Sequence, residues 1–205
     1  MSSEKRKYEL RARAEKQEET RQRIVAATSE LHQEVGPART TVAEIARRAG
    51  VNRVTVYNHF PEESELFAAC QAHFLSGHPL PDFEEALALE DPAARVRGVI
   101  RELYGSYRRT EPMTAKVLRD RGTMPALDAL MAQTLDAIQA YLVGTLSAGL
   151  RRRGAAARRT RAALALALDF WTWQRLAGEG LRDDEAADLM AQLVTSYLSQ
   201  ARRRS

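Results

Sequence analysis

Apolar residues recur every three or four positions along most of the chain, which is the spacing expected for one face of an α-helix. Gly, Pro and clustered polar residues separate these segments. We expect helices over residues 15–35, 62–76, 91–107, 113–119, 127–146, 160–177 and 183–201, two shorter helices between residues 40 and 60, and a loop over 77–85. No segment alternates like a strand between hairpin turns, so the predicted fold is all-α with about nine helices.

The N-terminal segment is charged rather than amphipathic. It has no Gly or Pro over residues 3–35, and it pairs Glu9 with Arg13 and Glu19 with Arg23 at the four-residue spacing that supports a helix. Its first half has few large apolar residues to bury, and a helix without packing is only marginally stable in water. We therefore expect residues 1–19 to form a basic arm or helix extension, frayed before about residue 15.

Residues 40–60, TTVAEIARRAGVNRVTVYNHF, contain two short helical segments joined by a turn. Thr41 is a suitable N-cap for the first, and Gly50 can take the left-handed conformation that ends it. Asn52 can cap the second segment, in which Val56 points inward and meets the small Ala46 of the first. This spacing predicts a helix-turn-helix, whose second helix lies in the DNA major groove.

The net charge of +4 is unevenly distributed. Residues 1–60 hold 12 Lys and Arg against 8 Asp and Glu, whereas residues 61–205 hold 19 of each. A basic end joined to a neutral remainder is typical of a nucleic-acid-binding module attached to another domain. A solvated charged helix at the N-terminus is the alternative explanation.

Cysteine content and apolar run length indicate a cytoplasmic protein. The single Cys70 excludes an internal disulfide, and its apolar neighbours favour a packed core position over a redox role. No apolar run approaches the roughly 18 residues that span a bilayer. The first 23 residues are dominated by charged and amide side chains, unlike a secretion signal.

Several side chains of the motif invite a catalytic interpretation. Tyr57 and His59 with Glu62 are proton-transfer groups, but an all-α enzyme needs them to converge on a pocket. His73, His78 and Asp82 suggest a metal site, although their spacing straddles a helix end and a Pro-containing loop. We expect the chain not to be an enzyme and to need no metal or cofactor.

The stretch TTVAEIARRAGVNRVTVYNHFPEESELF resembles the DNA-binding signature of the tetracycline-repressor (TetR) family of transcriptional regulators. The resemblance covers about residues 20–75 and rests on Ala46, Gly50, Tyr57, His59 and Phe60 in register. It implies a three-helix DNA-binding domain over residues 20–65 and a larger helical domain over 66–205 for ligand binding and dimerisation. The chain would bind a palindromic DNA operator as a homodimer and respond to an unknown small-molecule effector.

The resemblance also assigns DNA contacts. Backbone phosphates would be met by Thr41, Tyr57 and His59, and base edges by Arg53, Val54, Thr55 and Asn58. Side-chain chemistry agrees, because Arg can bind guanine, Asn can bind adenine, and Val or Thr methyls can pack on thymine.

One position departs from the family pattern. Many relatives have a basic residue three positions after the Phe, and here that residue is Glu63, so a phosphate contact is lost. A basic arm that reaches a minor groove or flanking phosphates would compensate. Its cations are Lys5, Arg6, Lys7, Arg11, Arg13 and Lys16.

An effector site is expected among the aromatic and apolar residues of the larger domain, where cavities with a few polar anchors hold small molecules. The candidate lining residues are Tyr104, Tyr107, Met113, Leu118, Met131, Leu135 and Trp171. Ordinary helical core is the alternative for these residues. Arg108, Arg119 and Arg121 are candidate anchors for an anionic ligand, with solvated surface as the alternative.

The last two expected helices supply a surface for an intersubunit four-helix bundle. The residues are Ala162, Ala163, Ala165, Leu166, Leu189, Leu193, Val194, Tyr197 and Leu198. Packing within one chain is the alternative use of this face. Together these features predict a ligand-responsive transcriptional regulator, most simply a repressor. A ligand-independent regulator and a non-specific nucleic-acid-binding protein are the alternatives.

Overall fold

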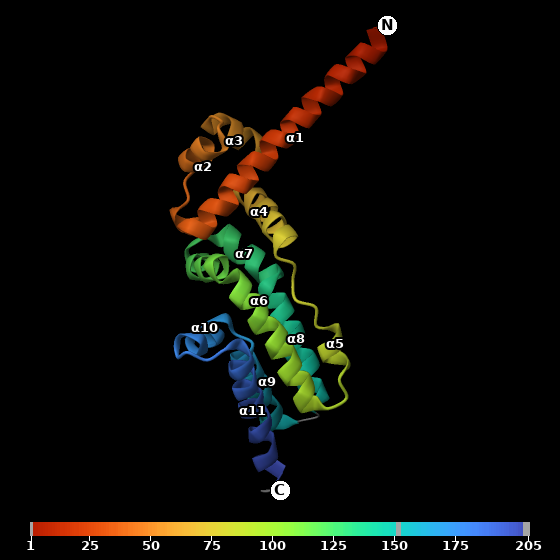
Figure 1. Cartoon of the computed structure of the whole chain (residues 1–205), viewed down its shortest axis with the longest axis vertical. Coiled ribbons are helices and arrows are strands. Elements are labelled where there is room, and N and C mark those ends of the chain that lie inside the picture. Colours follow the sequence, from red (N-terminus) through yellow and green to blue (C-terminus); the bar gives the residue numbers. More distant parts are fainter. Residues whose placement is uncertain (1, 151–152, 203–205) are drawn as a thin grey trace. The chain divides into compact units, whose positions relative to one another are not determined.

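The computed structural model describes the backbone of residues 2–150 and 153–202, and the side chains of residues 4–150 and 153–195. All regular elements in these ranges are helices (Figure 1), which confirms the all-α prediction. They are α1 Ser2–Glu34, η1 Pro37–Arg39, α2 Val42–Ala49, α3 Arg53–His59, α4 Glu63–Gly77, α5 Glu84–Ala88, α6 Pro92–Asp120, η2 Arg121–Thr123, α7 Pro125–Gln133, α8 Leu135–Gly149, α9 Gly154–Ala167, α10 Phe170–Gly178 and α11 Asp183–Arg202.

The chain forms two compact units. Unit 1 comprises residues 1–78 and 112–130, and unit 2 comprises residues 79–111 and 131–205. Helix α6 therefore contributes to both units. The domain boundary expected at residue 65 falls inside α4, whose remaining turns also belong to unit 1.

Helix α1 extends without interruption from Ser2, so the segment expected to be frayed before residue 15 is helical. No Gly or Pro interrupts it, and Arg11 Nε donates to Glu15 Oε1 at 2.9 Å on its exposed surface. Such pairs support a helix that has no tertiary packing.

Helix α6 also continues further than the pattern predicts, because it passes through Pro112 into the segment expected as a separate helix. A proline inside a helix removes one backbone hydrogen bond, but it does not have to end the helix. Tyr107 and Met113, on either side of Pro112, are both buried, so each half of α6 is packed within its own unit.

Elsewhere the chain is divided more finely than the expected nine helices. Thr134, with φ −115° and ψ −84°, separates α7 from α8. Asp169 separates α9 from α10, and its carboxylate accepts a hydrogen bond from Thr172 N at 2.8 Å as an N-cap. The short helix α5 occupies part of the segment expected as a loop.

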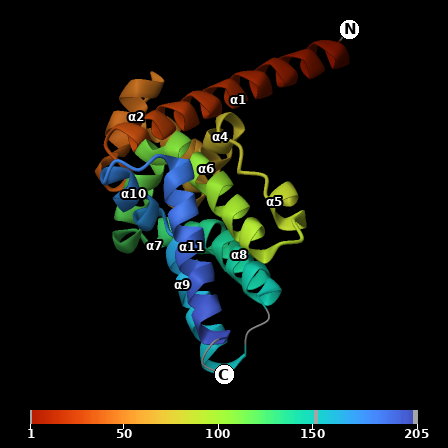
Figure 2. The same ribbon diagram turned by 60° about the horizontal axis from the view of Figure 1, so that its bottom comes forward.

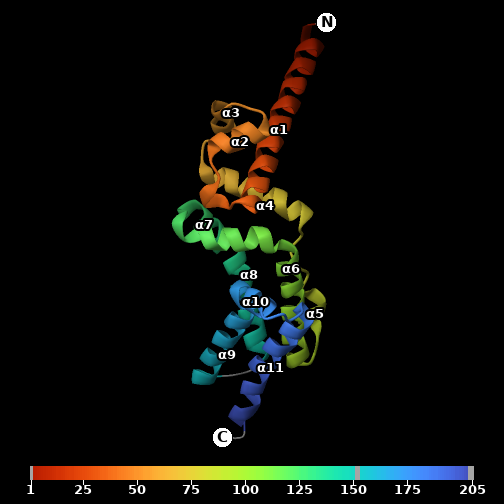
Figure 3. The ribbon, with the colours of Figure 1, turned by 60° about the vertical axis from the view of Figure 1, so that its left-hand side comes forward.

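The core of unit 1 joins α1 to the three helices that follow it (Figure 3). Its buried residues are Ile24, Val25, Ala27, Leu31, Ile45, Ala46, Ala49, Val56, Phe60, Leu66 and Cys70. Burial raises the pKa of the Cys70 thiol to about 12, which favours the packed core position over a redox role.

Helix α6 also contributes its C-terminal end to unit 1. Asp120 is buried, and its Oδ2 accepts from Ala38 N at 3.0 Å while Arg119 Nη2 donates to Val35 O at 3.2 Å. These bonds fasten the end of α6 to the turn after α1, where Gly36 has φ +95°.

Unit 2 is built around α6, α8, α9, α10 and α11, and α9 and α11 lie side by side (Figure 2). Its largest fully buried side chains include Trp173, Tyr104 and Phe170. The Tyr107 ring lies 5.2 Å from the Phe170 ring and 5.8 Å from the Trp173 ring, measured between centroids. This aromatic cluster joins α6 to α10.

Candidate nucleic-acid interface

Helices α2 and α3 form the helix-turn-helix that the sequence predicts. The Thr41 hydroxyl accepts a hydrogen bond from Glu44 N at 3.2 Å and begins α2. Gly50 ends α2 in the left-handed conformation, with φ 66° and ψ 38°, and Val51 N then donates to Ala46 O at 3.0 Å. Asn52 begins α3 by accepting from Thr55 N at 2.8 Å.

Three contacts from α1 fix the position of this motif. Arg48 of α2 donates to both carboxylate oxygens of Glu34, at 2.6 and 2.8 Å. Arg23 Nη1 donates to Ala49 O at 3.2 Å, at the C-terminal end of α2. The Arg21 guanidinium carbon lies 4.7 Å from the centre of the Phe60 ring, a cation–π contact at the end of α3.

These anchors were not recognised from the sequence. The available signal is that Arg21 and Arg23 lie within one turn of Ile24, where the buried face of α1 begins.

Most of the predicted DNA-contacting side chains share the outer surface of α3. Val56 is buried in the core, whereas Arg53, Val54, Tyr57 and Asn58 are exposed. Val54 is 65% exposed and Tyr57 is 56% exposed. An arginine, an amide and two exposed apolar groups on a single short helix form a surface suited to base edges and thymine methyls.

The other three predicted contacts lie at the ends of the helices. Thr55 and His59 of α3 are partly exposed, and Thr41 is exposed at the start of α2. The Thr55 hydroxyl donates to Asn52 Oδ1 at 2.9 Å, so its donor is already used while its methyl stays available. The Thr41 hydroxyl is an acceptor in the cap of α2, which leaves its proton free for a phosphate oxygen.

The charge around α3 is mixed. Arg47 is exposed but forms an ion pair with Glu44. Immediately after α3, Glu62, Glu63 and Glu65 are all exposed at the start of α4. These carboxylates would repel a nearby phosphate. Because Arg47 is paired, the surface beside α3 also has fewer free cations than the sequence count suggests.

The residues predicted to line an effector site do not all lie in one unit. Met113 and Leu118 belong to the part of α6 in unit 1, and the other five belong to unit 2. Met113 and Met131 are buried, and Leu118 and Leu135 are partly buried.

Tyr104 and Tyr107 have internal partners in unit 2. The Tyr104 hydroxyl donates to Ala167 O at 2.9 Å, and the Tyr107 hydroxyl donates to Leu168 O at 2.8 Å. Gln139 Nε2 donates to the same Leu168 O at 3.1 Å. Burial raises the pKa of both tyrosines, which therefore remain neutral donors. These bonds satisfy carbonyls at the C-terminal end of α9, where the helix no longer supplies a donor.

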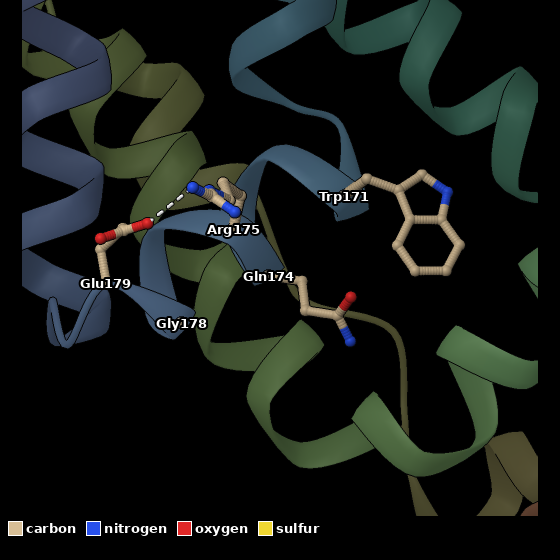
Figure 4. A pocket seen from close by; sticks show the side chains of 5 residues that line it. All are labelled: Trp171, Gln174, Arg175, Gly178 and Glu179. Atoms are coloured by element: carbon tan, nitrogen blue, oxygen red, sulfur yellow. Dashed lines mark ion pairs between the residues drawn. The ribbon is translucent and has the colours of Figure 1, made fainter.

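Unit 2 has a shallow concavity of about 370 Å³ along α10, of which Trp171 is the one predicted member. Its lining residues are Trp171, Gln174, Arg175, Gly178 and Glu179. Figure 4 shows the Trp171 ring extending away from the ion pair between Arg175 and Glu179, whose N–O distance is 2.8 Å. The concavity thus combines one half-exposed indole with an amide and a neutralised pair of charges.

Each arginine considered as an anion anchor has a carboxylate partner. Arg108 binds Asp183 at 2.8 Å, and its guanidinium carbon lies 4.9 Å from the centre of the Trp173 ring. Arg119 pairs with Asp120 and Arg121 pairs with Asp128, each at 2.7 Å.

The residues considered as a metal site have local roles. His78 Nδ1 lies 3.2 Å from Phe74 O, and Asp82 Oδ1 accepts from Glu84 N at 2.8 Å. Among the side chains of residues 4–150 and 153–195, no group of three or more His, Cys, Asp or Glu is placed to hold a metal ion.

The proposed dimer surface is partly supported by exposure. Leu166 of α9 and Leu193 of α11 are 59% and 55% exposed, and Leu189 is 37% exposed. Ala162 and Ala165 are also exposed, and Ala163 is partly exposed. Val194 differs from the prediction because it is buried within its own chain, and the side chains of Tyr197 and Leu198 lie outside the described residues.

No helix in the described part of the chain is both long enough and apolar enough to cross a membrane.

The helix-turn-helix region is similar to known DNA-binding regulators. Residues 24–70 match the bacterial regulatory proteins of the tetR family. The nucleoid occlusion factor SlmA of Pasteurella multocida is 28% identical over 141 residues, covering 66% of this chain and 70% of that protein. The HTH-type transcriptional regulator SrpR of Pseudomonas putida is 42% identical over 81 residues, covering 39% of this chain and 37% of that protein.

A solved structure shares the fold over most of both chains. It is NalD, the secondary repressor of the MexAB-OprM multidrug efflux pump in Pseudomonas aeruginosa. The TM-score is 0.60 at 23% sequence identity, and the likeness covers 89% of this chain and 96% of NalD.

Proposed function

Because the chain carries the DNA-binding domain of the TetR family of bacterial regulatory proteins, we propose that it binds a palindromic operator as a homodimer and regulates transcription, as a repressor, in response to a small molecule. The observation that carries the proposal is the exposed outer surface of α3, with Arg53, Val54, Tyr57 and Asn58 on a helix held by capped ends and a buried Val56. An exposed valine and tyrosine lie beside an amide and an arginine that has no ion-pair partner among the described residues, and this set suits a major groove better than water.

In this proposal Arg53 and Asn58 bind base edges, and Val54 and the Thr55 methyl pack on thymine methyl groups. Tyr57, His59 and Thr41 bind phosphates and so fix the register of α3 in the groove. The backbone contacts orient the domain, and the base contacts supply sequence preference.

Dimerisation follows from the need to read two half-sites and from the exposed apolar groups of α9 and α11. Leu166, Leu189 and Leu193 are large aliphatic side chains that a second copy can cover. The neighbouring Ala162 and Ala165 allow close approach of helices. A two-fold dimer places two α3 helices about one turn of DNA apart, roughly 34 Å or a multiple of it.

The effector acts through a coupled equilibrium. A small molecule that binds unit 2 in one conformation of the dimer shifts the population toward that conformation and changes operator affinity. A coupling free energy of roughly 1–3 kcal/mol is sufficient for a 5–150-fold change. Trp171 and the concavity along α10 supply one exposed indole for such a contact.

A ligand-independent regulator is the alternative. It is favoured by the use of both Tyr104 and Tyr107 hydroxyls in bonds to α9, which leaves these groups with internal roles. Such a regulator would be switched by its abundance or by a protein partner.

Selection of bound fragments from a genomic library, followed by titration of the recovered sites, tests the proposal. We expect a palindrome whose affinity falls with salt, and Arg53→Ala to weaken binding by about tenfold or more and relax the preference at one base pair. Arg175→Ala is the matched control, because it removes an exposed arginine from unit 2. Recovery of random fragments would refute the proposal, and a small-molecule panel that leaves operator affinity unchanged would favour the ligand-independent alternative.

A further inference from the structure

The first half of α1 is an exposed helix with no packing partner in the described chain. Every side chain from Glu4 to Glu19 is exposed, and the segment projects beyond α2 and α3 in both Figure 1 and Figure 3. At 1.5 Å per residue, residues 4–19 extend about 24 Å. Because the segment is continuous with the packed part of α1, it has a fixed direction relative to the helix-turn-helix.

Contacts further along α1 identify the side that faces the helix-turn-helix. Arg21 lies over Phe60, Arg23 donates to Ala49 O, and Ile24 is fully buried against the motif. We call this side of α1, continued to the N-terminus, the inner side, and the opposite one the outer side.

Helical periodicity assigns the exposed residues to these two sides. Residues 11 and 18 positions apart lie on the same side of an α-helix, so Arg13 and Arg6 lie on the same side as Ile24. The inner side carries Lys5, which lies 18 positions before Arg23, together with Arg6, Glu9, Leu10, Arg13, Lys16 and Gln17. The outer side carries Glu4, Lys7, Tyr8, Arg11, Glu15, Glu18 and Glu19.

The two sides therefore have opposite charge. The inner side has four cations and one carboxylate, and the outer side has four carboxylates and two cations. On the outer side, Arg11 is also paired with Glu15 at 2.9 Å. Most cations of this segment lie on the side that faces the helix-turn-helix, and most of its carboxylates lie on the opposite side. The inner side would therefore attract a polyanion, and the outer side would repel it.

We propose that the inner side of α1 binds the phosphate backbone of duplex DNA that flanks the operator. The inference rests on the proposed function, because it extends the same DNA surface. Two observations favour DNA over another occupant: the charge of the inner side, and its continuity with the part of α1 that packs on the helix-turn-helix.

The flanking contact also explains how the domain tolerates the carboxylates after α3. Glu62, Glu63 and Glu65 would weaken phosphate binding beside α3. The cations of the inner side would compensate by binding phosphates further along the duplex. A reach of about 24 Å corresponds to roughly seven base pairs at 3.4 Å per step on each side of the operator.

The test compares two duplexes that share one selected operator. The short duplex ends at the palindrome, and the long duplex adds ten base pairs of arbitrary sequence on each side. The variants are R6Q/R13Q, which removes two inner cations, and K7Q/R11Q, which removes two outer cations and so has the same net charge. Glutamine is a good helix former, and circular dichroism verifies that α1 is retained.

We expect the wild type to bind the long duplex at least about tenfold more tightly than the short one at low salt. R6Q/R13Q should remove this advantage and reduce the salt slope on the long duplex by about 2 per protomer, since each phosphate contact contributes about 0.9. It should leave binding to the short duplex unchanged within about twofold. K7Q/R11Q should behave like the wild type on both duplexes, because the periodicity of α1 places Lys7 and Arg11 on the outer side, whereas the sequence alone assigned all six cations of the arm to DNA.

Equal affinity of the wild type for both duplexes would overturn the inference, as would equal losses in R6Q/R13Q and K7Q/R11Q, which would reduce the effect to net charge. Failure of the proposed function has a different signature, in which the short duplex binds no better than a scrambled sequence. The salt slope of R6Q/R13Q on a long scrambled duplex would still test the inner side in that case.

Discussion

His32 makes the stability of unit 1 depend on pH, and its replacement tests how the helix-turn-helix is supported. The side chain lies on α1, is 5% exposed, and has its ring centroid 5.7 Å from that of Phe67 in α4. Burial lowers the pKa of His32 from its ordinary 6.5 to about 4, although the Asp120 carboxylate acts in the opposite direction. At neutral pH the imidazole is therefore uncharged and contributes to the core.

The sign of the effect follows from proton binding in the two states. Between pH 6.5 and about 4 the unfolded chain protonates His32 and the folded chain does not, so acid favours unfolding. With these two pKa values, lowering the pH from 7 to 5 costs about 2 kcal/mol of unfolding free energy. The pKa of Asp120 is held below its ordinary 3.8, because hydrogen bonds from Arg119 and Ala38 outweigh its burial, so that group titrates outside this window.

Urea unfolding at pH 7 and pH 5, followed by far-UV circular dichroism, measures the effect. His32→Gln removes the titration, and we expect it to be less stable than the wild type at pH 7 but to lose about 2 kcal/mol less between the two pH values. Tryptophan fluorescence serves as an internal control, because both Trp residues lie in unit 2. Equal losses in the wild type and His32→Gln would refute the argument and place the acid sensitivity elsewhere.

Three further predictions follow from other contacts. Gly36→Ala should destabilise unit 1 by about 2 kcal/mol or more in urea unfolding. The reason is that Gly36 has φ +95° and that a Cβ there would lie 2.4 Å from Arg119 Nη2 and 2.6 Å from Asp120 Oδ2. An unchanged unfolding midpoint would contradict the described turn. Glu63→Lys should raise operator affinity several-fold and increase the salt slope by about 1 per protomer in a binding titration, because it replaces a repulsive carboxylate with a cation; unchanged affinity would mean that α4 lies away from the phosphates. Leu193→Asp should convert a dimer to a monomer in analytical ultracentrifugation. Because the Leu193 side chain is 55% exposed in one chain, the change should alter monomer stability by less than about 0.5 kcal/mol. A persisting dimer would show that this face is not the dimer interface.

The helix-turn-helix was predictable from the sequence because its determinants are local. The Thr41 cap, the left-handed Gly50 and the Asn52 cap each involve backbone groups three or four residues away. Such interactions depend on residue type and spacing, and the sequence shows both directly. The exposed surface of α3 follows from the same periodicity once Val56 is assigned to the core.

The division of unit 2 into helices was not predictable in this way. The apolar pattern continues across Leu168 and Asp169, yet α9 ends there, and its last carbonyls accept hydrogen bonds from Tyr104, Tyr107 and Gln139. These donors lie about 30 to 60 positions away in the sequence. The spacing of residues within α9 therefore cannot predict where the helix ends.

By itself, the sequence determined the all-α class, the helix-turn-helix and the charge difference between residues 1–60 and the rest of the chain, since each depends on residue type and short-range order. Tertiary structure decided which apolar residues are covered, as the burial of Val194 beside the exposed Leu193 illustrates. It also decided that Tyr104 and Tyr107 direct their hydroxyls to α9. The physical reason is that burial and hydrogen-bond partnership depend on neighbours brought together by folding, and one helical period can suit several arrangements of such neighbours.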